Sequence, residues 1–261
     1  MPRLTPVAAG PLAALARLLA AALLCVPLVL PAAAAPPSEA GDEEIALSLA
    51  NLLRAARAVV AAEQDLINDP APGDKGLTGD AVLAAALDNY RQATGRDPLA
   101  IDPESRHGRL LAAQMAAIKE VMDEHQEAIN RPGVGFMGFV PAVFGRLVGE
   151  RFGEKAGDEA RVKVTAPPEL VRNLKARPDA WEAAAIADAL KSPEWPEGKV
   201  FAAEAEVRGR PAYRILVPEY YSAGCLTCHG GPKGEIDVTG YPKEGGALGD
   251  LGGVISVTLF R

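Results

Sequence analysis

Apolar residues recur every three or four positions along the first half of the chain, which is the spacing of one face of a helix. This pattern predicts helices over residues 43–68 and 79–94. The first helix is expected to end before a breaker rich in proline at 69–73, and Gly95 stands where glycine favours a helix C-cap. The N-terminal part of the chain is therefore predicted to be helical.

A third helix has the strongest signals at its ends. Asp102 followed by Pro103 is a favourable pair for the N-cap and first turn, and the Arg-Pro-Gly segment at 131–133 is expected to stop the helix. An apolar seam follows it in alternating steps of four and three, at Leu111, Met115, Ile118, Met122, His125 and Ile129. The seam places a histidine at an apolar interface.

The second half of the chain contains every aromatic residue except Tyr90, so the bulky part of the core is expected there. Two further helices are predicted, one from Pro141 and one over residues 178–191. Alternating and β-branched patterns, with a compact turn at 208–210, predict strands over residues 161–165, 199–207, 212–217 and 254–260. The predicted fold class is α+β, in which N-terminal helices pack on a small antiparallel sheet.

Residues 1–35 have the pattern of a cleavable signal peptide. Arg3 gives a short basic start, residues 18–30 are uninterruptedly apolar, and small alanines for a signal peptidase follow. The apolar stretch is short for a membrane span, and no cationic cluster follows it. We expect cleavage near Ala34 or Ala35, no membrane insertion of the mature chain, and a periplasmic location.

Net charge narrows the range of partners. The full chain has a formal charge of −7, and removing residues 1–35 takes away two arginines and no acid, so 34 acids and 25 bases leave −9. A nucleic-acid partner is excluded because it needs a basic face. The same cleavage removes Cys25, so Cys225 and Cys228 become the only cysteines.

These two cysteines belong to a Cys-x-x-Cys-His motif that ends in His229, the attachment signature of a c-type haem. Two cysteines three positions apart reach the two vinyl groups of one porphyrin and form thioethers. The adjacent histidine then lies under the iron and supplies the proximal axial nitrogen. One covalent haem c is therefore predicted at Cys225, Cys228 and His229.

Three other uses of the Cys-x-x-Cys-His motif fit the sequence less well than haem attachment. A disulfide between Cys225 and Cys228 gives His229 no role. A structural zinc site needs four ligands, which His107 and His125 supply poorly. A thioredoxin-like pair is expected at the start of a helix after a strand, whereas this motif enters a Gly-Pro-Lys-Gly loop.

The sixth iron ligand has candidates on the third helix. Met122 and His125 lie on its apolar seam and are the candidates for the one distal ligand, and each also fits the role of a core residue. A second protein ligand favours electron transfer, whereas an open position favours binding of small gases or peroxide. Basic residues are candidate partners for the haem propionates, namely Arg172, Lys175, Arg177 and Arg214.

Several segments of the second half resemble one known family. They are P-P-E-L-V-R-N at 167–173, R-P-D-A-W-E at 177–182, the stretch 221–230, G-Y-P at 240–242 and the glycine-rich start of the last strand at 249–257. In this order they resemble the c-type haem-binding, PAS-like periplasmic family, found alone or as the sensing part of histidine kinases and chemoreceptors. The resemblance covers residues 130–261 well and the earlier helices loosely.

The resemblance implies a PAS-like antiparallel sheet behind N-terminal helices, with haem on Cys225 and Cys228 and with His229 as proximal ligand. It also implies a sixth ligand from the N-terminal helices that can be a cysteine, but the mature chain has none there. The expected organisation is a signal peptide over 1–35, a helical region over 36–130 and a PAS-like haem-binding domain over 131–261.

The predicted function is that of a periplasmic monohaem c-type cytochrome that carries single electrons between redox partner proteins. The alternative is a haem-based redox or gas sensor that acts through a signalling partner, an analogy that fold alone does not establish. A small peroxidase-like enzyme is less favoured because it needs an open distal side and an acid–base group. We therefore expect a haem-binding protein rather than an enzyme.

Overall fold

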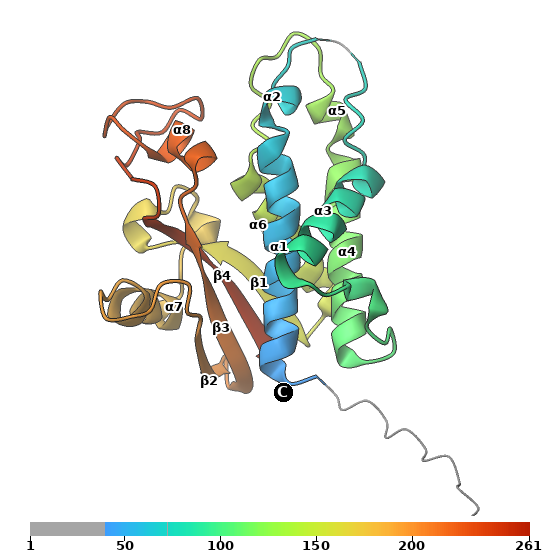
Figure 1. Cartoon of the computed structure of the whole chain (residues 1–261), viewed down its shortest axis with the longest axis vertical. Coiled ribbons are helices and arrows are strands. Elements are labelled where there is room, and N and C mark those ends of the chain that lie inside the picture. Colours follow the sequence, from blue (N-terminus) through green and yellow to red (C-terminus); the bar gives the residue numbers. More distant parts are fainter. Residues whose placement is uncertain (1–39, 72) are drawn as a thin grey trace, which may run out of the picture. The chain divides into compact units, whose positions relative to one another are not determined.

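A computed structural model of the chain describes residues 40–71 and 73–261, so the predicted signal peptide lies outside the described part. The residues from 40 onward form one compact unit. Its first half is a layer of helices, formed by α1 (Asp42–Ala62), α2 (Gln64–Ile67), α3 (Gly79–Thr94), α4 (Arg106–Glu124), α5 (Gln126–Ile129) and α6 (Pro141–Ala156). Figure 1 shows this layer on one side of a small sheet.

The first two predicted helices are confirmed. The helix predicted over 43–68 is interrupted at Glu63, which separates α1 from the single turn of α2. The helix α3 has the predicted bounds, and Gly95 caps it in the left-handed conformation with φ of 67°. Among the described helices, α1 alone is long and apolar enough to span a membrane, but most of the residues in that apolar stretch are buried in this core.

The predicted start of the third helix is wrong. The helix α4 begins at Arg106, and Ser105 is its N-cap, because the Ser105 side chain accepts a hydrogen bond from the Gly108 amide. The backbone carbonyl of Asp102 instead accepts a hydrogen bond from the Ser105 amide at 3.1 Å, in a turn that precedes the helix. The helix also stops at Glu124, so His125 lies at the junction with α5 rather than inside a long helix.

The sheet has four antiparallel strands in the order β1-β4-β3-β2, comprising β1 (Ala160–Thr165), β2 (Phe201–Val207), β3 (Arg210–Tyr220) and β4 (Leu251–Phe260). The closing strand β4 is central and is buried from Gly253 to Leu259, which explains its β-branched composition. Arg208 and Gly209 join β2 to β3 with positive φ values of 53° and 79°, as a two-residue type I′ hairpin turn requires.

The two faces of the sheet have separate cores. Ile255, Val257 and Leu259 of β4 pack with the buried residues of the helical layer. Leu216 and Val254 point to the other face and pack with α7 (Ala180–Ala185) and its neighbours. The predicted α+β fold class, with helices packed on a small antiparallel sheet, is therefore confirmed, whereas the PAS-like character of the sheet stays a prediction.

A buried charge network anchors α7 to the second face. Arg214 of β3 is 4% exposed and pairs with Asp179 at 2.7 Å and with Glu182 at 3.3 Å. Glu182 is 2% exposed and also binds Lys163 of β1 at 2.8 Å. The guanidinium lies 4.2 Å from the ring centre of Trp181. The Asp-Ala-Trp-Glu segment thus serves both to cap α7 and to hold it on the sheet.

Replacing Arg214 with Ala should destabilise the fold by about 3–5 kcal/mol, because breaking a buried ion pair leaves the remaining charge poorly compensated. Chemical denaturation followed by circular dichroism measures this change. Arg91→Ala is the control, because Arg91 pairs with Asp88 at the surface, and its effect should stay below about 1 kcal/mol. Equal losses in the two variants would contradict the assignment.

Candidate functional site

The Cys-x-x-Cys-His motif lies where the chain leaves β3. Cys225 ends a short turn of 3-10 helix, and the next residues form α8 (Leu226–His229), a helix of one turn. The motif therefore stands at a short helix start after a strand, which the sequence analysis did not expect. The chain enters the predicted loop at Gly230, where a Cβ atom would come within 2.5 Å of the Leu226 carbonyl oxygen.

Two neighbours fix the imidazole of His229. Its Nδ1 lies 2.9 Å from Oε2 of Glu244. The ring of Tyr221 stacks on it with a centroid distance of 5.1 Å and an interplanar angle of 15°. A carboxylate accepts hydrogen bonds, so Nδ1 carries the proton and the lone pair of Nε2 is left for another partner.

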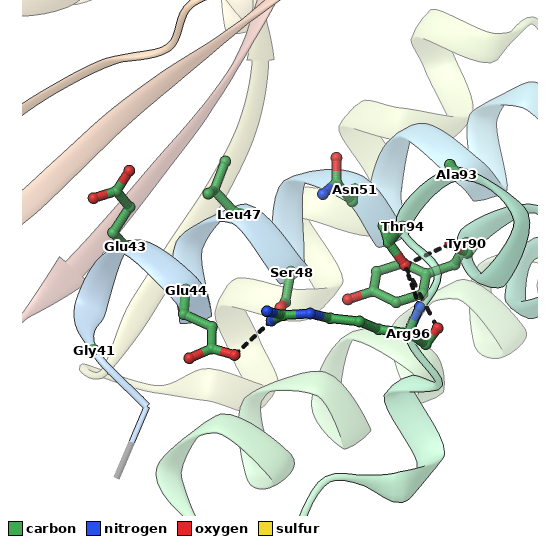
Figure 2. Close-up of a pocket in the computed structure, with 10 residues that line it drawn as sticks. All are labelled: Gly41, Glu43, Glu44, Leu47, Ser48, Asn51, Tyr90, Ala93, Thr94 and Arg96. Carbon is green, nitrogen blue, oxygen red and sulfur yellow. Dashed lines mark hydrogen bonds and ion pairs between the residues drawn. The ribbon is translucent and has the colours of Figure 1, made fainter. Parts of the chain in front are cut away.

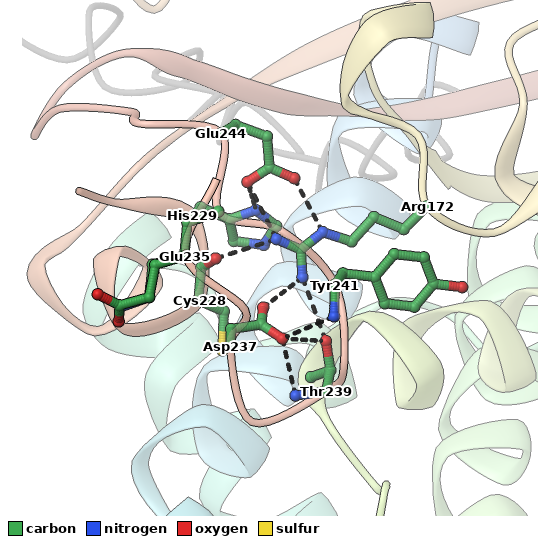
Figure 3. Close-up of polar contacts among 9 residues, drawn as sticks. Arg172, Cys228, His229, Glu235, Asp237, Thr239, Tyr241 and Glu244 are labelled. Carbon is green, nitrogen blue, oxygen red and sulfur yellow. Dashed lines mark hydrogen bonds and ion pairs between the residues drawn. The ribbon is translucent and has the colours of Figure 1, made fainter. Parts of the chain in front are cut away.

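Arg172 holds Glu244 in place (Figure 3). Its Nε and Nη2 donate to the two carboxylate oxygens of Glu244 at 2.8 and 3.0 Å, and Nη2 also donates to the Cys228 carbonyl at 3.0 Å. Burial acts to raise the pKa of Glu244, but the hydrogen bonds from Arg172 and His229 outweigh it and lower that pKa. The hydrogen-bond acceptor of His229 is therefore an ionised carboxylate.

Asp237 completes the network on the far side of Arg172. Its Oδ2 accepts from Nη1 of Arg172 at 2.6 Å, and its Oδ1 accepts from the amide and hydroxyl of Thr239 at 2.7 and 2.6 Å. Burial acts to raise the pKa of Asp237, but the hydrogen bonds from Thr239 and Arg172 outweigh it, so that the pKa lies well below its ordinary value. One guanidinium thus joins two carboxylates around the motif.

Glycines form a slot for Tyr221. A Cβ atom at Gly246 would lie 2.6 Å from Cε2 of Tyr221, and one at Gly252 would clash with Cε1 on the other edge of the ring. Burial, followed by the negative charge of Glu244, raises the pKa of Tyr221 to about 12, so its hydroxyl stays protonated. The ring is confined between these glycines and His229.

Both thiols are half-buried and unbonded to each other, which does not support a disulfide. Oγ of Ser222 lies 3.3 Å from Sγ of Cys225. Burial, followed by the charge of Asp237, raises the pKa of Cys228, whereas a reactive redox thiol needs a lowered pKa. Among the described residues there is also no group of three or more His, Cys, Asp or Glu side chains that could hold a metal ion.

The contacts of Met122 and His125 lie within the helical layer. Met122 is fully buried in its core. Nδ1 of His125 lies 2.8 Å from the Val121 carbonyl oxygen, and its ring lies 5.0 Å from the ring of Phe139. Neither residue is among the contacts of His229 described above, so their role as distal ligands stays a prediction.

Of the four candidate propionate partners, Arg172 alone is joined to the motif by a hydrogen bond. Arg214 is bound to α7, Lys175 faces Glu150 at 3.6 Å, and the Arg177 carbonyl accepts a bond from Lys163. Neither Glu244 nor Asp237 is predicted from the sequence as a site residue. Glu244 is 15 residues from His229 in a loop, where no spacing rule connects the two.

One surface cleft of the described residues, of about 660 Å³, lies between the start of α1 and the end of α3. There Glu44 and Arg96 pair at 2.6 Å, and Tyr90 points toward Ser48 (Figure 2). A second cleft of about 460 Å³ is lined in part by Arg172, Tyr241 and Glu244. The second adjoins the motif network.

The fold and the site define an α+β domain with a cytochrome-like Cys-x-x-Cys-His motif. A family model described as Tll0287-like matches residues 96–259, which is more than half of the chain. The chain belongs to the Tll0287-like family, which is associated with haem binding. No curated protein and no solved structure matches the chain.

Replacing Gly252 with Ala should displace Tyr221 and destabilise the fold by about 1–3 kcal/mol, because the new methyl group overpacks the slot. Thermal unfolding of the full chain measures this loss. The double variant with Tyr221→Ala should lose less stability than the sum of the two single losses, since the energies of coupled neighbours are not additive. Gly224→Ala is the control, because nothing lies within 4 Å of a Cβ atom there; additive losses would contradict the slot.

Proposed function

We propose that the chain is an exported monohaem c-type cytochrome that carries single electrons between partner proteins in the periplasm. The observation that carries this proposal is the arrangement around His229. Its Nδ1 is bound to Glu244 at 2.9 Å, while two unpaired thiols lie within the preceding turn. Membership of a haem-associated family and the pattern of a signal peptide support the proposal.

The side chains present fit a covalently attached haem. Cys225 and Cys228 would form the two thioethers, and Nε2 of His229 would be the axial ligand because Nδ1 is already bound. A ligating histidine is commonly oriented by a carboxylate on its other nitrogen, which is the role of Glu244 here. Among the described residues, Nε2 of His229 has no hydrogen-bond partner.

When bound, the haem would supply an iron that gains and loses one electron. The chain's own residues tether and orient: Arg172 holds Glu244, Glu244 keeps the proton on Nδ1 of His229, and Tyr221 sets the plane of the imidazole. These contacts restrain the orientation of the His229 imidazole. Met122 and His125 are the two candidates for the one remaining protein ligand of the iron, and their contacts in this structure lie within the helical layer.

Maturation in a host with haem-ligation machinery should give one covalent haem per chain, detected as added mass on the intact protein. Changing both Cys225 and Cys228 to Ser should abolish attachment, because serine forms no thioether with the vinyl groups. Thr227→Ala should retain the haem, since this exposed side chain occupies a variable position of the motif. Bare thiols in the unmodified chain would refute the proposal.

Optical titration of the purified holoprotein separates the carrier from its alternatives. A spectrum that carbon monoxide and peroxide leave unchanged is expected for a carrier with two axial protein ligands. Rapid binding of carbon monoxide without turnover would instead support the sensor, and dye oxidation driven by peroxide would support the peroxidase-like enzyme. Either of these outcomes overturns the carrier role while leaving haem attachment intact.

A further inference from the structure

The polar network behind His229 contains more acid than base. Arg172 carries one positive charge, and Glu244 and Asp237 each carry one negative charge, which leaves a net charge of −1 beside the imidazole of His229. Lys243 does not change this count, because it pairs with Glu235 at 2.7 Å. Figure 3 shows Glu235 pointing away from the network.

The excess charge is poorly screened by water. The side chain of Asp237 is 0% exposed, and those of Glu244 and Arg172 are 17% and 18% exposed. Charges in such surroundings interact more strongly than charges at the surface, and salt screens them less. The acidic excess therefore acts on whatever His229 binds.

The excess reaches the ligand through a direct contact. Oε2 of Glu244 lies 2.9 Å from Nδ1 of His229, and both carboxylate oxygens are restrained by Arg172. A hydrogen bond to a carboxylate raises the basicity of a metal-bound imidazole. A more basic ligand next to a negative charge stabilises the iron state of higher positive charge.

We propose that Glu244, supported by Arg172 and Asp237, is a positioning residue that lowers the reduction potential of the haem and keeps the iron oxidised until a strong donor reduces it. This inference rests on the proposed function. When bound, the haem would supply a one-electron couple, with the electron coming from a redox partner protein. Glu244, Asp237 and Arg172 together would place one net negative charge beside it and would favour its oxidised, more positively charged state.

Spectroelectrochemical titration of the holoprotein tests the charge. In Glu244→Gln the amide oxygen can still accept from Nδ1, so the absorption spectrum should persist while the charge is lost. The ratio of ferrous to ferric protein at a fixed electrode potential should rise by about tenfold, equivalent to about 59 mV for a one-electron couple. Asp237→Asn, which changes a residue without contact to His229, should shift the ratio in the same direction by a smaller factor.

Glu197→Gln is the control, because it removes an exposed acid that is not part of the network around His229. It should change the ratio by less than about twofold, as expected for a screened surface charge. The inference is overturned if Glu244→Gln, with haem attached and its spectrum intact, shifts the ratio no more than this control does.

A measurement without haem keeps this test separate from that of the proposed function. Nitrogen-15 NMR of the full chain before haem attachment should find the proton of His229 on Nδ1, and Glu244→Ala should give a mixture of the two tautomers. Absence of covalent haem with the expected tautomer would refute the cytochrome but not the positioning role. A proton on Nε2 in the unmodified chain would refute the positioning role itself.

Discussion

The ion pair between Arg172 and Glu244 is the constraint on which the site depends. The two residues are 72 positions apart, and the guanidinium also reaches the Cys228 carbonyl and the Asp237 carboxylate. The loop between α8 and β4 has little regular secondary structure of its own, so hydrogen bonds of this kind must hold it. Without Arg172, two buried carboxylates would face each other with no cation between them, and the orientation of His229 would be lost.

The sheet supplies the rigid frame to which this loop is attached. Strands β3 and β4 are neighbours in the sheet. Tyr221 follows the end of β3 and Gly252 lies near the start of β4, so the ring of Tyr221 packs directly against Gly252. The helical layer holds the end of β3 in turn, because Arg54 and Arg57 of α1 both bind Glu219 at 2.5 Å. The position of the one-turn helix α8 is therefore fixed by its attachment to β3, which β4 and α1 hold in turn.

Two arginines in the second half of the chain have different roles, because Arg214 holds α7 on the sheet and Arg172 binds the motif. The Asp-Ala-Trp-Glu segment belongs to the second face of the sheet and not to the site around the Cys-x-x-Cys-His motif, although Arg214, its partner, was a candidate for binding propionates. Arg172 was a candidate of the same kind and does lie at the motif. Residue type alone could not separate the two arginines, because both kinds of site need a guanidinium facing carboxylates.

The sequence by itself determined the helices and strands whose periodicity is long enough to read, the two-residue turn of the hairpin, and the motif of Cys225, Cys228 and His229. Each of these depends on residues a few positions apart, which chain geometry brings together whatever the rest of the molecule does. The start of α4 was misplaced because Ser105 and Asp102 are both favourable cap residues, and the local sequence does not distinguish them. Only the tertiary structure decided that Glu244, Asp237 and Tyr221 surround His229, because contacts between segments far apart depend on how the sheet, loop and helices pack, and no local spacing encodes that.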